Sequence, residues 1–213
     1  MVQTAITEAI TTLAEAEDRF HLQRTEAVEF FPEWQTALTT PEPGETVALD
    51  DLRRRYLYHR SAGNLLEGTV TLLVASPLLT IAGFYDPPFR VRTEESVLLT
   101  LDDSEEVLRG RIDVLVLQDQ FWVVVVESKK TAISAWAALP QALAYMMANP
   151  HPEKTGYGLV TNGDDILFVK LKRDGSALYD VSRVFALFTS GRELYGVLQV
   201  LKRIAGEIVG VGG

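Results

Sequence analysis

The chain has 213 residues, 47% of them hydrophobic and 23% charged, a balance typical of a globular protein large enough to bury a core. It contains no cysteine, which excludes disulfides and thiolate metal sites and fits a reducing compartment. Its 29 acidic and 20 basic residues leave a net charge of −9, so binding to nucleic acid would need a local basic patch, a divalent metal or a partner subunit.

Zinc sites, secretion and membrane insertion are also disfavoured. His21, His59 and His151 lie far apart without ligand spacing, which argues against zinc. No signal peptide opens the chain, and no uncharged apolar run reaches the roughly 18 residues of a membrane span. We therefore expect a cytoplasmic protein with no membrane partner.

The N-terminal part of the chain predicts one helix and an irregular arm. Residues 2–17 place Ile6, Ile10 and Leu13 at helical spacing, which is the pattern of an amphipathic helix. Residues 18–45 contain several prolines and predict an extended arm or short strand followed by a loop.

A second helix is expected at residues 51–60, capped by Asp50 or Asp51. It carries the densest positive cluster of the chain, Arg53 to Arg55, which we interpret as a solvated helix face. We expect residues 1–60 to form a helical N-terminal extension packed on the rest of the protein.

A long core helix is predicted over residues 65–84, with Asn64 as its cap. Pro77 should kink or restart this helix, and Gly83 fits its end. Glu67 lies in its first turn, where a favourable interaction with the helix dipole is one sufficient explanation for a carboxylate.

A β-hairpin follows in the middle of the chain. Residues 91–102 predict an edge or meander strand, and residues 111–117 and 121–127 predict two apolar strands joined by the polar connection 118–120. Asp113 interrupts the first of these two strands. A carboxylate in such an apolar run is costly to bury unless it is paired or binds a metal.

Glu127 and Lys129 lie at the end of the second strand, two residues apart, so their side chains should point to the same face. If Asp113 faces that side too, two carboxylates and one ammonium share a small volume. Such a site suits Mg²⁺, which takes hard oxygen ligands and often binds through one or two carboxylates. The alternative is an ordinary ion pair at a strand end.

The second half of the chain completes an α/β pattern. Residues 131–150 predict a core helix with a kink or restart at Pro140, and residues 156–171 predict two strands around an Asn-Gly turn. Residues 176–187 could add a strand, and residues 192–208 form a closing amphipathic helix. This order predicts a mixed central sheet flanked by helices.

Asp113, followed fourteen residues later by Glu127-Ser128-Lys129, resembles the metal-binding signature of the PD-(D/E)XK nuclease superfamily. That family places the signature on two adjacent strands, as the hairpin predicts here. The resemblance implies a restriction-endonuclease-like fold.

Further elements resemble the N-terminal nuclease domain of type I restriction enzyme R subunits. They are a helix with Glu67, Pro77 and Gly83-Phe84, the Q-x-x-x-Y residues Gln141 and Tyr145, and the turn Thr161-Asn162-Gly163. The resemblance implies a nuclease-like domain at residues 61–213 that forms one compact unit with the N-terminal extension. The helicase motor that follows this domain in R subunits has no counterpart in the sequence, so a stand-alone relative is expected.

The resemblance also implies roles for individual residues. The metal, Mg²⁺ or Mn²⁺, would be bound by Asp113, Glu127, the Ser128 carbonyl and Glu67. Lys129 would orient or activate the attacking water, and Gln141 and Tyr145 would fix the lysine or a phosphate. Without the resemblance, the last two are also explained as residues at the edge of the core.

Three hypotheses for function follow. The first is a Mg²⁺-dependent endonuclease that hydrolyses DNA in a restriction-modification setting, with partner subunits or as a homodimer. The second is a catalytically silent nucleic-acid- or protein-binding module on the nuclease fold, which the acidic balance favours; the intact Asp113, Glu127 and Lys129 favour the first. The third is an assembly or regulatory protein that acts through its N-terminal helices.

Overall fold

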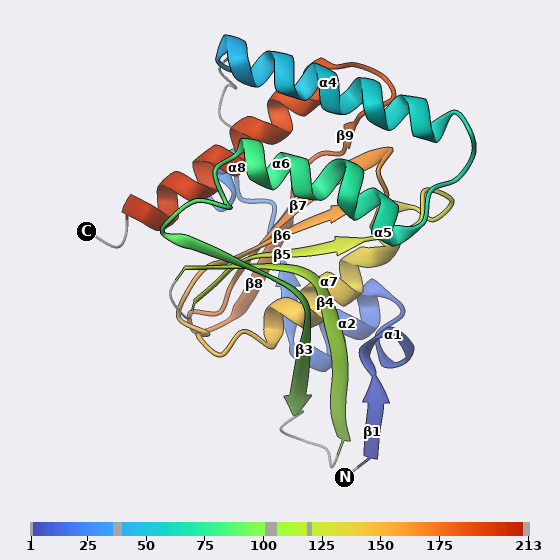
Figure 1. The fold of residues 1–213 in the computed structure, drawn as a ribbon. Helices are drawn as coiled ribbons and strands as arrows, with labels where there is room; N and C mark the ends of the chain where they lie inside the picture. The colour runs from blue at the N-terminus through green and yellow to red at the C-terminus, as the bar shows by residue number, and fades with distance from the viewer. Residues whose placement is uncertain (1, 36–39, 101–105, 119–120, 211–213) are drawn as a thin grey trace.

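The computed structural model describes residues 2–35, 40–100, 106–118 and 121–210. In this part of the chain, a central sheet lies between two layers of helices (Figure 1). The mixed α/β fold predicted from the sequence is confirmed.

The strands of the described residues form one nine-stranded sheet. They are β1 (Val2–Ala5), β2 (Leu22–Arg24), β3 (Phe89–Thr100), β4 (Glu106–Gln118), β5 (Phe121–Ser128), β6 (Gly156–Thr161), β7 (Asp165–Lys172), β8 (Ala177–Val181) and β9 (Phe185–Ala186). The order is β1-β4-β5-β6-β7-β8-β2, with β3 paired to β4 and β9 paired to β7. The pairs β1–β4, β5–β6 and β2–β8 are parallel and the others antiparallel, so the sheet is mixed.

Two helical layers cover the sheet. The helices are α1 (Ile6–Ala9), α2 (Leu13–Phe20), α3 (Pro32–Gln35), α4 (Pro43–Arg60), α5 (Glu67–Val70), α6 (Ser76–Ile81), α7 (Leu139–Met147) and α8 (Arg192–Gly210), with a π-helical turn η1 (Thr71–Ala75) and a 3-10 turn η2 (Ala135–Ala138). Helices α4, α6 and α8 pack on one face, and α1, α2 and α7 pack on the other (Figure 1). Among the described helices, none combines the length and apolar character that crossing a membrane requires.

The middle of the sheet is buried on both faces, whereas most side chains of β3 are exposed or half-buried. Along β7, Ile166 and Phe168 belong to the hydrophobic cluster under α4, α6 and α8, whereas Leu167 and Val169 belong to the cluster under α7. All four side chains are fully buried. A strand covered on both sides has no polar face, which explains why its sequence is a continuous apolar run rather than an alternating one.

The prediction of one helix over residues 2–17 is wrong. The chain begins with β1, which pairs in parallel with the first residues of β4, and the helical part is split into α1 and α2. Thr12 starts α2 with a capping box: its hydroxyl accepts from the Glu15 N–H at 3.2 Å, and the Glu15 carboxylate accepts from the Thr12 N–H at 2.9 Å. This T-x-x-E signal marks a helix start inside the apparent single helix.

The predicted caps of the next two helices are also wrong. Helix α4 begins at Pro43 rather than near Asp51, because Glu42 caps it together with Glu45 and proline is favoured at the first helical position. The helix that contains Glu67 is capped by Leu66, without a side-chain hydrogen bond, and not by Asn64. The division at residue 60 stays a prediction, although β1 and β2 from the first 60 residues belong to the same sheet as the later strands.

Both predicted hairpins are confirmed in their strand pairing. Strands β4 and β5 are antiparallel neighbours, and so are β6 and β7; the connection predicted at 118–120 lies partly outside the described residues. Pro77 and Pro140 each lie in the first turn of a new α-helix, after η1 and after η2 respectively. Gly83 ends α6 with a left-handed φ of 86°.

A buried ion pair fastens the short helix α3 to the sheet. Lys170 of β7 and the hydroxyl of Tyr157 of β6 both donate to Glu33 Oε1 at 2.5 Å. Glu33 and Lys170 are 4% and 5% exposed. Burial lowers the pKa of Lys170, and its hydrogen bond to Glu33 opposes that shift.

Because each of these charges depends on the other, Lys170→Met should lower the free energy of unfolding by about 3–5 kcal/mol. Adding Glu33→Gln, which keeps an acceptor for Tyr157, should restore most of that loss. Urea denaturation measures both effects. The control is Lys202→Met, which breaks the surface pair with Glu45 and should cost no more than about 1 kcal/mol; an equal cost in the two single variants would contradict the prediction.

Candidate active site

The candidate site lies where β4 and β5 separate. Their pairing runs up to Val114↔Val126, and the next residue of β5, Glu127, is in register with Val160 of β6. The carboxylate of Asp113 fills the gap, because its Oδ2 accepts a 2.7 Å hydrogen bond from the Ser128 N–H. The last contact between β4 and β5 is therefore a hydrogen bond between the Asp113 side chain and the Ser128 backbone amide.

Glu127 and Lys129 form a nearly buried ion pair beside this gap. Lys129 Nζ lies 2.8 Å from Glu127 Oε1, and the two side chains are 13% and 5% exposed. In the described part of the chain, the second oxygen, Glu127 Oε2, is buried and has no hydrogen-bond partner. An unsatisfied carboxylate oxygen is costly inside a protein. Among the described residues Glu33 Oε2, in the structural ion pair with Lys170, is in the same situation, so what marks this corner is the second carboxylate, Asp113, beside the ion pair.

The surroundings of the site raise the pKa of both carboxyl groups. The pKa of Glu127 is raised to about 7, mainly by burial and also by the charges of Asp113 and Glu67, while Lys129 opposes the shift. Burial likewise raises the pKa of Asp113, against the lowering effects of the Ser128 N–H and of Lys129. Such strongly perturbed carboxyls are a mark of functional sites.

Glu67 reaches the site from the helical layer opposite α7. It begins α5, and its charge is close enough to raise the pKa of both Asp113 and Glu127. The helix is tied to β5 by Thr71 of η1, whose hydroxyl contacts the Glu67 carbonyl at 3.1 Å and Ser128 Oγ at 3.0 Å. Single π-helical turns often occur at functional sites.

Tyr145 approaches from α7, on the other face of the sheet. It is 2% exposed, and burial together with the charge of Glu127 raises its pKa. Gly110 of β4 makes room for it, since a Cβ there would lie 2.5 Å from Tyr145 Cε1. Gln141 lies one turn earlier on α7, and within the described residues its buried Oε1 also lacks a hydrogen-bond partner.

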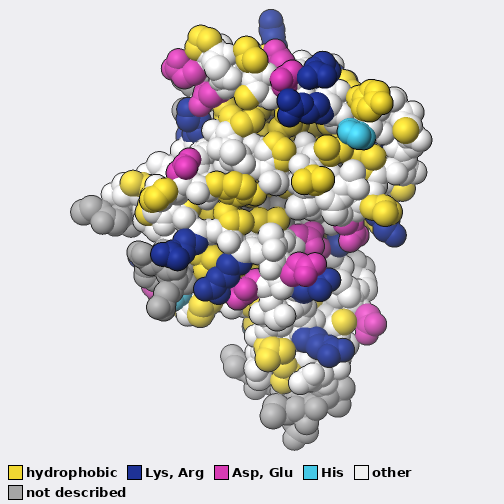
Figure 2. All heavy atoms as spheres, in the orientation of Figure 1, with side chains coloured by type: hydrophobic (Ala, Val, Ile, Leu, Met, Phe, Trp, Pro, Cys, Tyr) yellow, Lys and Arg dark blue, Asp and Glu magenta, His cyan; other side chains and the backbone are white. Residues whose placement is uncertain are grey.

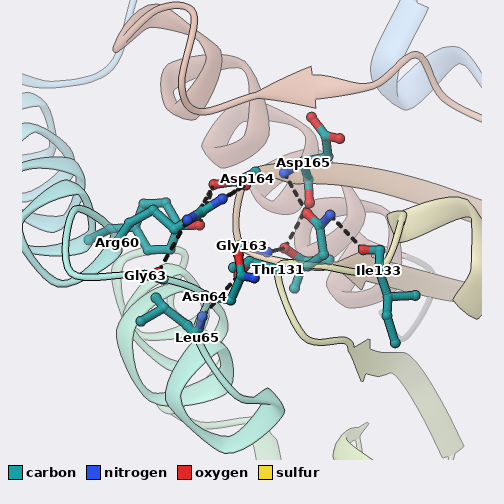
Figure 3. Close-up of polar contacts among 12 residues, drawn as sticks. Arg60, Gly63, Asn64, Leu65, Thr131, Ile133, Gly163, Asp164 and Asp165 are labelled. Carbon is teal, nitrogen blue, oxygen red and sulfur yellow. Dashed lines mark hydrogen bonds and ion pairs between the residues drawn. The ribbon is translucent and has the colours of Figure 1, made fainter.

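A clasp joins the start of the Glu67 helix to the segment that follows Lys129 (Figure 3). Thr131 N–H donates to the Leu65 carbonyl at 3.2 Å, and Leu65 N–H donates to Thr131 Oγ1 at 2.9 Å. The Thr131 hydroxyl also donates to Asn64 Oδ1 at 3.3 Å. The clasp fixes Glu67 and Lys129 relative to each other, because each lies two residues from it.

The Thr161-Asn162-Gly163 turn supports the same region (Figure 3). Asn162 Nδ2 donates to the Ile133 carbonyl at 2.8 Å, and Thr161 Oγ1 accepts from the Gly163 N–H at 2.9 Å. Beside the turn, Asp164 accepts hydrogen bonds from Tyr56 and Arg60 of α4. The turn therefore has a structural role: it holds the loop after Lys129 in place.

Sequence reasoning missed several of these supporting residues. Thr71 and Thr131 gave no signal, because a threonine in a helix or loop has many uses. Arg53, predicted to be on a solvated face, donates instead to the carbonyls of Leu187 and Phe188. Arg54 and Arg55 form surface ion pairs with Asp51.

The residues present fit a divalent metal through two carboxylates rather than three. Within the described residues, no group of three or more His, Cys, Asp and Glu side chains is arranged to hold a metal ion. Mg²⁺ needs only one or two carboxylates when waters and a phosphate complete its shell. The free Glu127 Oε2 and the adjacent Asp113 supply that pair.

The surroundings of the site carry charges of both signs. Figure 2 shows acidic and basic side chains gathered below the helical layer, near the region where α5 meets the strands in Figure 1. Hydrophobic side chains lie among the other side chains on the surface of the helical layer above.

Comparisons with known proteins give little beyond architecture. No protein-family profile and no curated protein matches the chain. A solved fragment assigned as an HsdR subunit of a type I restriction enzyme from Vibrio vulnificus is 20% identical, with a TM-score of 0.40, over 67% of this chain and 26% of that chain. The match thus spans about a quarter of that solved chain, and the function proposed below rests on the residues of this chain.

The raised pKa of Glu127 predicts a pH-dependent stability. Between the unfolded value of 4.5 and about 7, the folded state keeps a proton that the unfolded state loses, so the free energy of unfolding falls as pH rises. Glu127→Gln removes this effect, with a difference in slope of up to about 1.4 kcal/mol per pH unit. Urea denaturation in EDTA from pH 4 to 8 measures it, and a pH-independent difference would contradict the prediction.

The turn that supports the site predicts a second stability effect. Gly163 has φ of 91°, and a Cβ there would lie 2.7 Å from the hydroxyl of the fully buried Tyr56. Gly163→Ala should therefore cost about 2–4 kcal/mol, from backbone strain and overpacking together. Gly175 is the matched control, because its φ is 80° but nothing lies within 4 Å of an added Cβ. Thermal or urea unfolding should show Gly175→Ala to be clearly the milder change.

Proposed function

We propose that this chain is a divalent-metal-dependent nuclease domain that hydrolyses DNA phosphodiester bonds. The observation that carries the proposal is the meeting of Asp113, Glu127 and Lys129 where β4 and β5 separate, with Glu127 Oε2 buried and unpartnered. A structural ion pair alone would not require a second buried carboxylate at the same corner. Two such carboxylates repel each other when both are ionised, so one of them must be protonated or a cation must offset their charge, as Lys129 does in part and a divalent metal would do fully.

Each residue of the site would have a separate role in the reaction. Asp113 and Glu127 would bind Mg²⁺ or Mn²⁺ with the Ser128 carbonyl, and Glu67, which lies outside that pair of carboxylates, would join them through water. When bound, the metal supplies Lewis-acid chemistry, polarising the scissile phosphate and lowering the pKa of a water. Lys129, released from Glu127 Oε1, would orient that water and stabilise the charge that develops on the phosphate.

The residues of α7 would complete the site. Gln141 has a free, buried carbonyl oxygen that can accept from the Lys129 ammonium once the lysine leaves Glu127. Tyr145 remains a neutral phenol at any working pH, because its pKa is raised, and can donate to a phosphate oxygen. Both residues would therefore position Lys129 or a phosphate rather than transfer a proton.

We further propose a setting in restriction-modification, as in the nuclease domains of type I R subunits. A chain with a net charge of −9 gains little from long-range attraction to DNA. Partner subunits or a homodimer would supply the remaining affinity and the sequence specificity.

The second candidate function is a catalytically silent module that binds nucleic acid or protein. The ion pair between Lys129 and Glu127 favours it, because this contact neutralises one of the two proposed metal ligands. The two candidates differ in whether a divalent cation can replace the lysine.

Titration calorimetry with Mn²⁺ or Mg²⁺, combined with plasmid cleavage in the same samples, tests the proposal. Asp113→Ala should lose both metal binding and cleavage, by more than the roughly 10- to 100-fold that loss of an outer-shell partner costs. Lys129→Met should keep metal binding and lose cleavage. Asp174→Ala, at an exposed position, is the control and should match the wild type.

Two other outcomes would contradict part or all of the proposal. Wild-type protein that binds no metal, even with DNA present, would leave only the silent module. Metal binding without cleavage in the wild type would keep the metal site and reject the nuclease.

A further inference from the structure

Strand β3 contains a left-handed residue opposite Asp113. Glu94 has φ of 54°, a conformation that glycine adopts readily and glutamate rarely does. The β3–β4 register passes from Thr93↔Val114 to Glu95↔Ile112, so Glu94 and Asp113 face each other without a ladder pairing. Pairing with β5 on the other edge of β4 also stops at Val114. Asp113 is thus outside the ladder on both edges.

At this point the side chains of β3 and β4 change the face of the sheet to which they point. Residues two apart in a regular strand share a face, yet Ile112 packs in the cluster under α7 and Val114 packs in the cluster under α4, α6 and α8. On β3, Val91 packs against the second cluster and Val97 belongs to the first, although they are six residues apart. Both strands therefore exchange faces between these residues, as the bend of the ribbon in Figure 1 illustrates.

The side chain of Glu94 does not explain its backbone conformation. It is 70% exposed, and its ion pair with Arg111 has a distance of 3.6 Å between two solvated groups. Such a surface pair contributes little. A strained residue that its own contacts do not stabilise points to a role elsewhere in the structure.

We propose that Glu94 is a positioning residue for the active site. Its left-handed conformation rotates the β3–β4 ribbon and withdraws Asp113 from the ladder on both edges. The Asp113 carboxylate is then free to accept from Ser128 and to bind next to Glu127. The catalytic consequence rests on the proposed nuclease function, whereas the structural consequence does not.

A substitution series at Glu94 tests this role. Gly and Asn tolerate the left-handed conformation, Ala is less suited to it, and Val is the least suited. All four variants remove the same carboxylate, so differences among them report the backbone and not the lost pair with Arg111. Thr93→Val, at an exposed extended neighbour, controls for the introduction of valine into this ribbon.

Two measurements read the series. Hydrogen exchange by NMR follows the Ser128 amide, whose hydrogen bond to Asp113 should persist in the Gly and Asn variants and weaken through Ala to Val. Metal-dependent DNA cleavage should follow the same order, with a loss on the order of 100-fold in the Val variant from misplacement of Asp113. The effect should fall on kcat and metal affinity rather than on KM for DNA.

The outcomes separate the two proposals. If Glu94→Val and Glu94→Gly exchange the Ser128 amide at the same rate, the positioning role is wrong, whatever the cleavage result. If the exchange order is as expected but the wild type cleaves no DNA, the positioning role stands and the nuclease function falls. Should the Val variant fail to fold, the Ala variant decides, because equal exchange in Ala and Gly would equally overturn the inference.

Discussion

The hydrogen bond from the Ser128 amide to the Asp113 carboxylate is the interaction on which the site depends. A buried carboxylate inside an apolar strand needs a partner, and here the partner is a backbone N–H that a continuous sheet would give to another strand. The 2.7 Å contact therefore exists only because β4 and β5 have separated. Separation leaves the end of β5 unpaired with β4, so Glu127 and Lys129 lie beside Asp113 at the same corner.

The rest of the fold holds the residues of this corner in place. The middle of the sheet is buried under helices on both faces, and each helical layer contributes to the site: Glu67 comes from α5, and Gln141 and Tyr145 come from α7. The helical layers cannot move independently, because Thr131 joins Leu65 to the segment after β5 and Asn162 fixes the next residues of that segment. Positioning of this kind, from rigid elements supported by hydrogen bonds, is what a catalytic or metal site requires.

Much of the architecture could be predicted from the sequence, because it follows from local patterns. The alternation of apolar segments and turn residues gave both hairpins, and the Asn-Gly dipeptide placed the turn between β6 and β7. The hairpin geometry also brought Asp113 close to the end of β5. What the sequence could not provide depends on distant partners: β1 pairs with β4 across about a hundred residues, and that pairing overrides the helical spacing of residues 2–17. The left-handed Glu94 and the π-helical turn likewise have no local signal, since they are conformations that tertiary packing imposes.

Under the proposed function, the charges of the site and of the whole protein affect how the metal and DNA bind. The charge of Glu67 raises the pKa of both Asp113 and Glu127, the charge of Asp113 also raises that of Glu127, and Lys129 lowers both pKa values. A phosphate approaching this corner would meet an excess of negative charge in an acidic protein. Under the proposed function, a bound divalent cation would reverse the sign of that local field and free Lys129 from Glu127. Because linkage is reciprocal, a cation that favours DNA binding must itself bind more tightly in the presence of DNA. Metal and DNA would then assemble at the site as a cooperative pair, and the raised pKa of Glu127, about 7, would make that assembly easier as the pH rises.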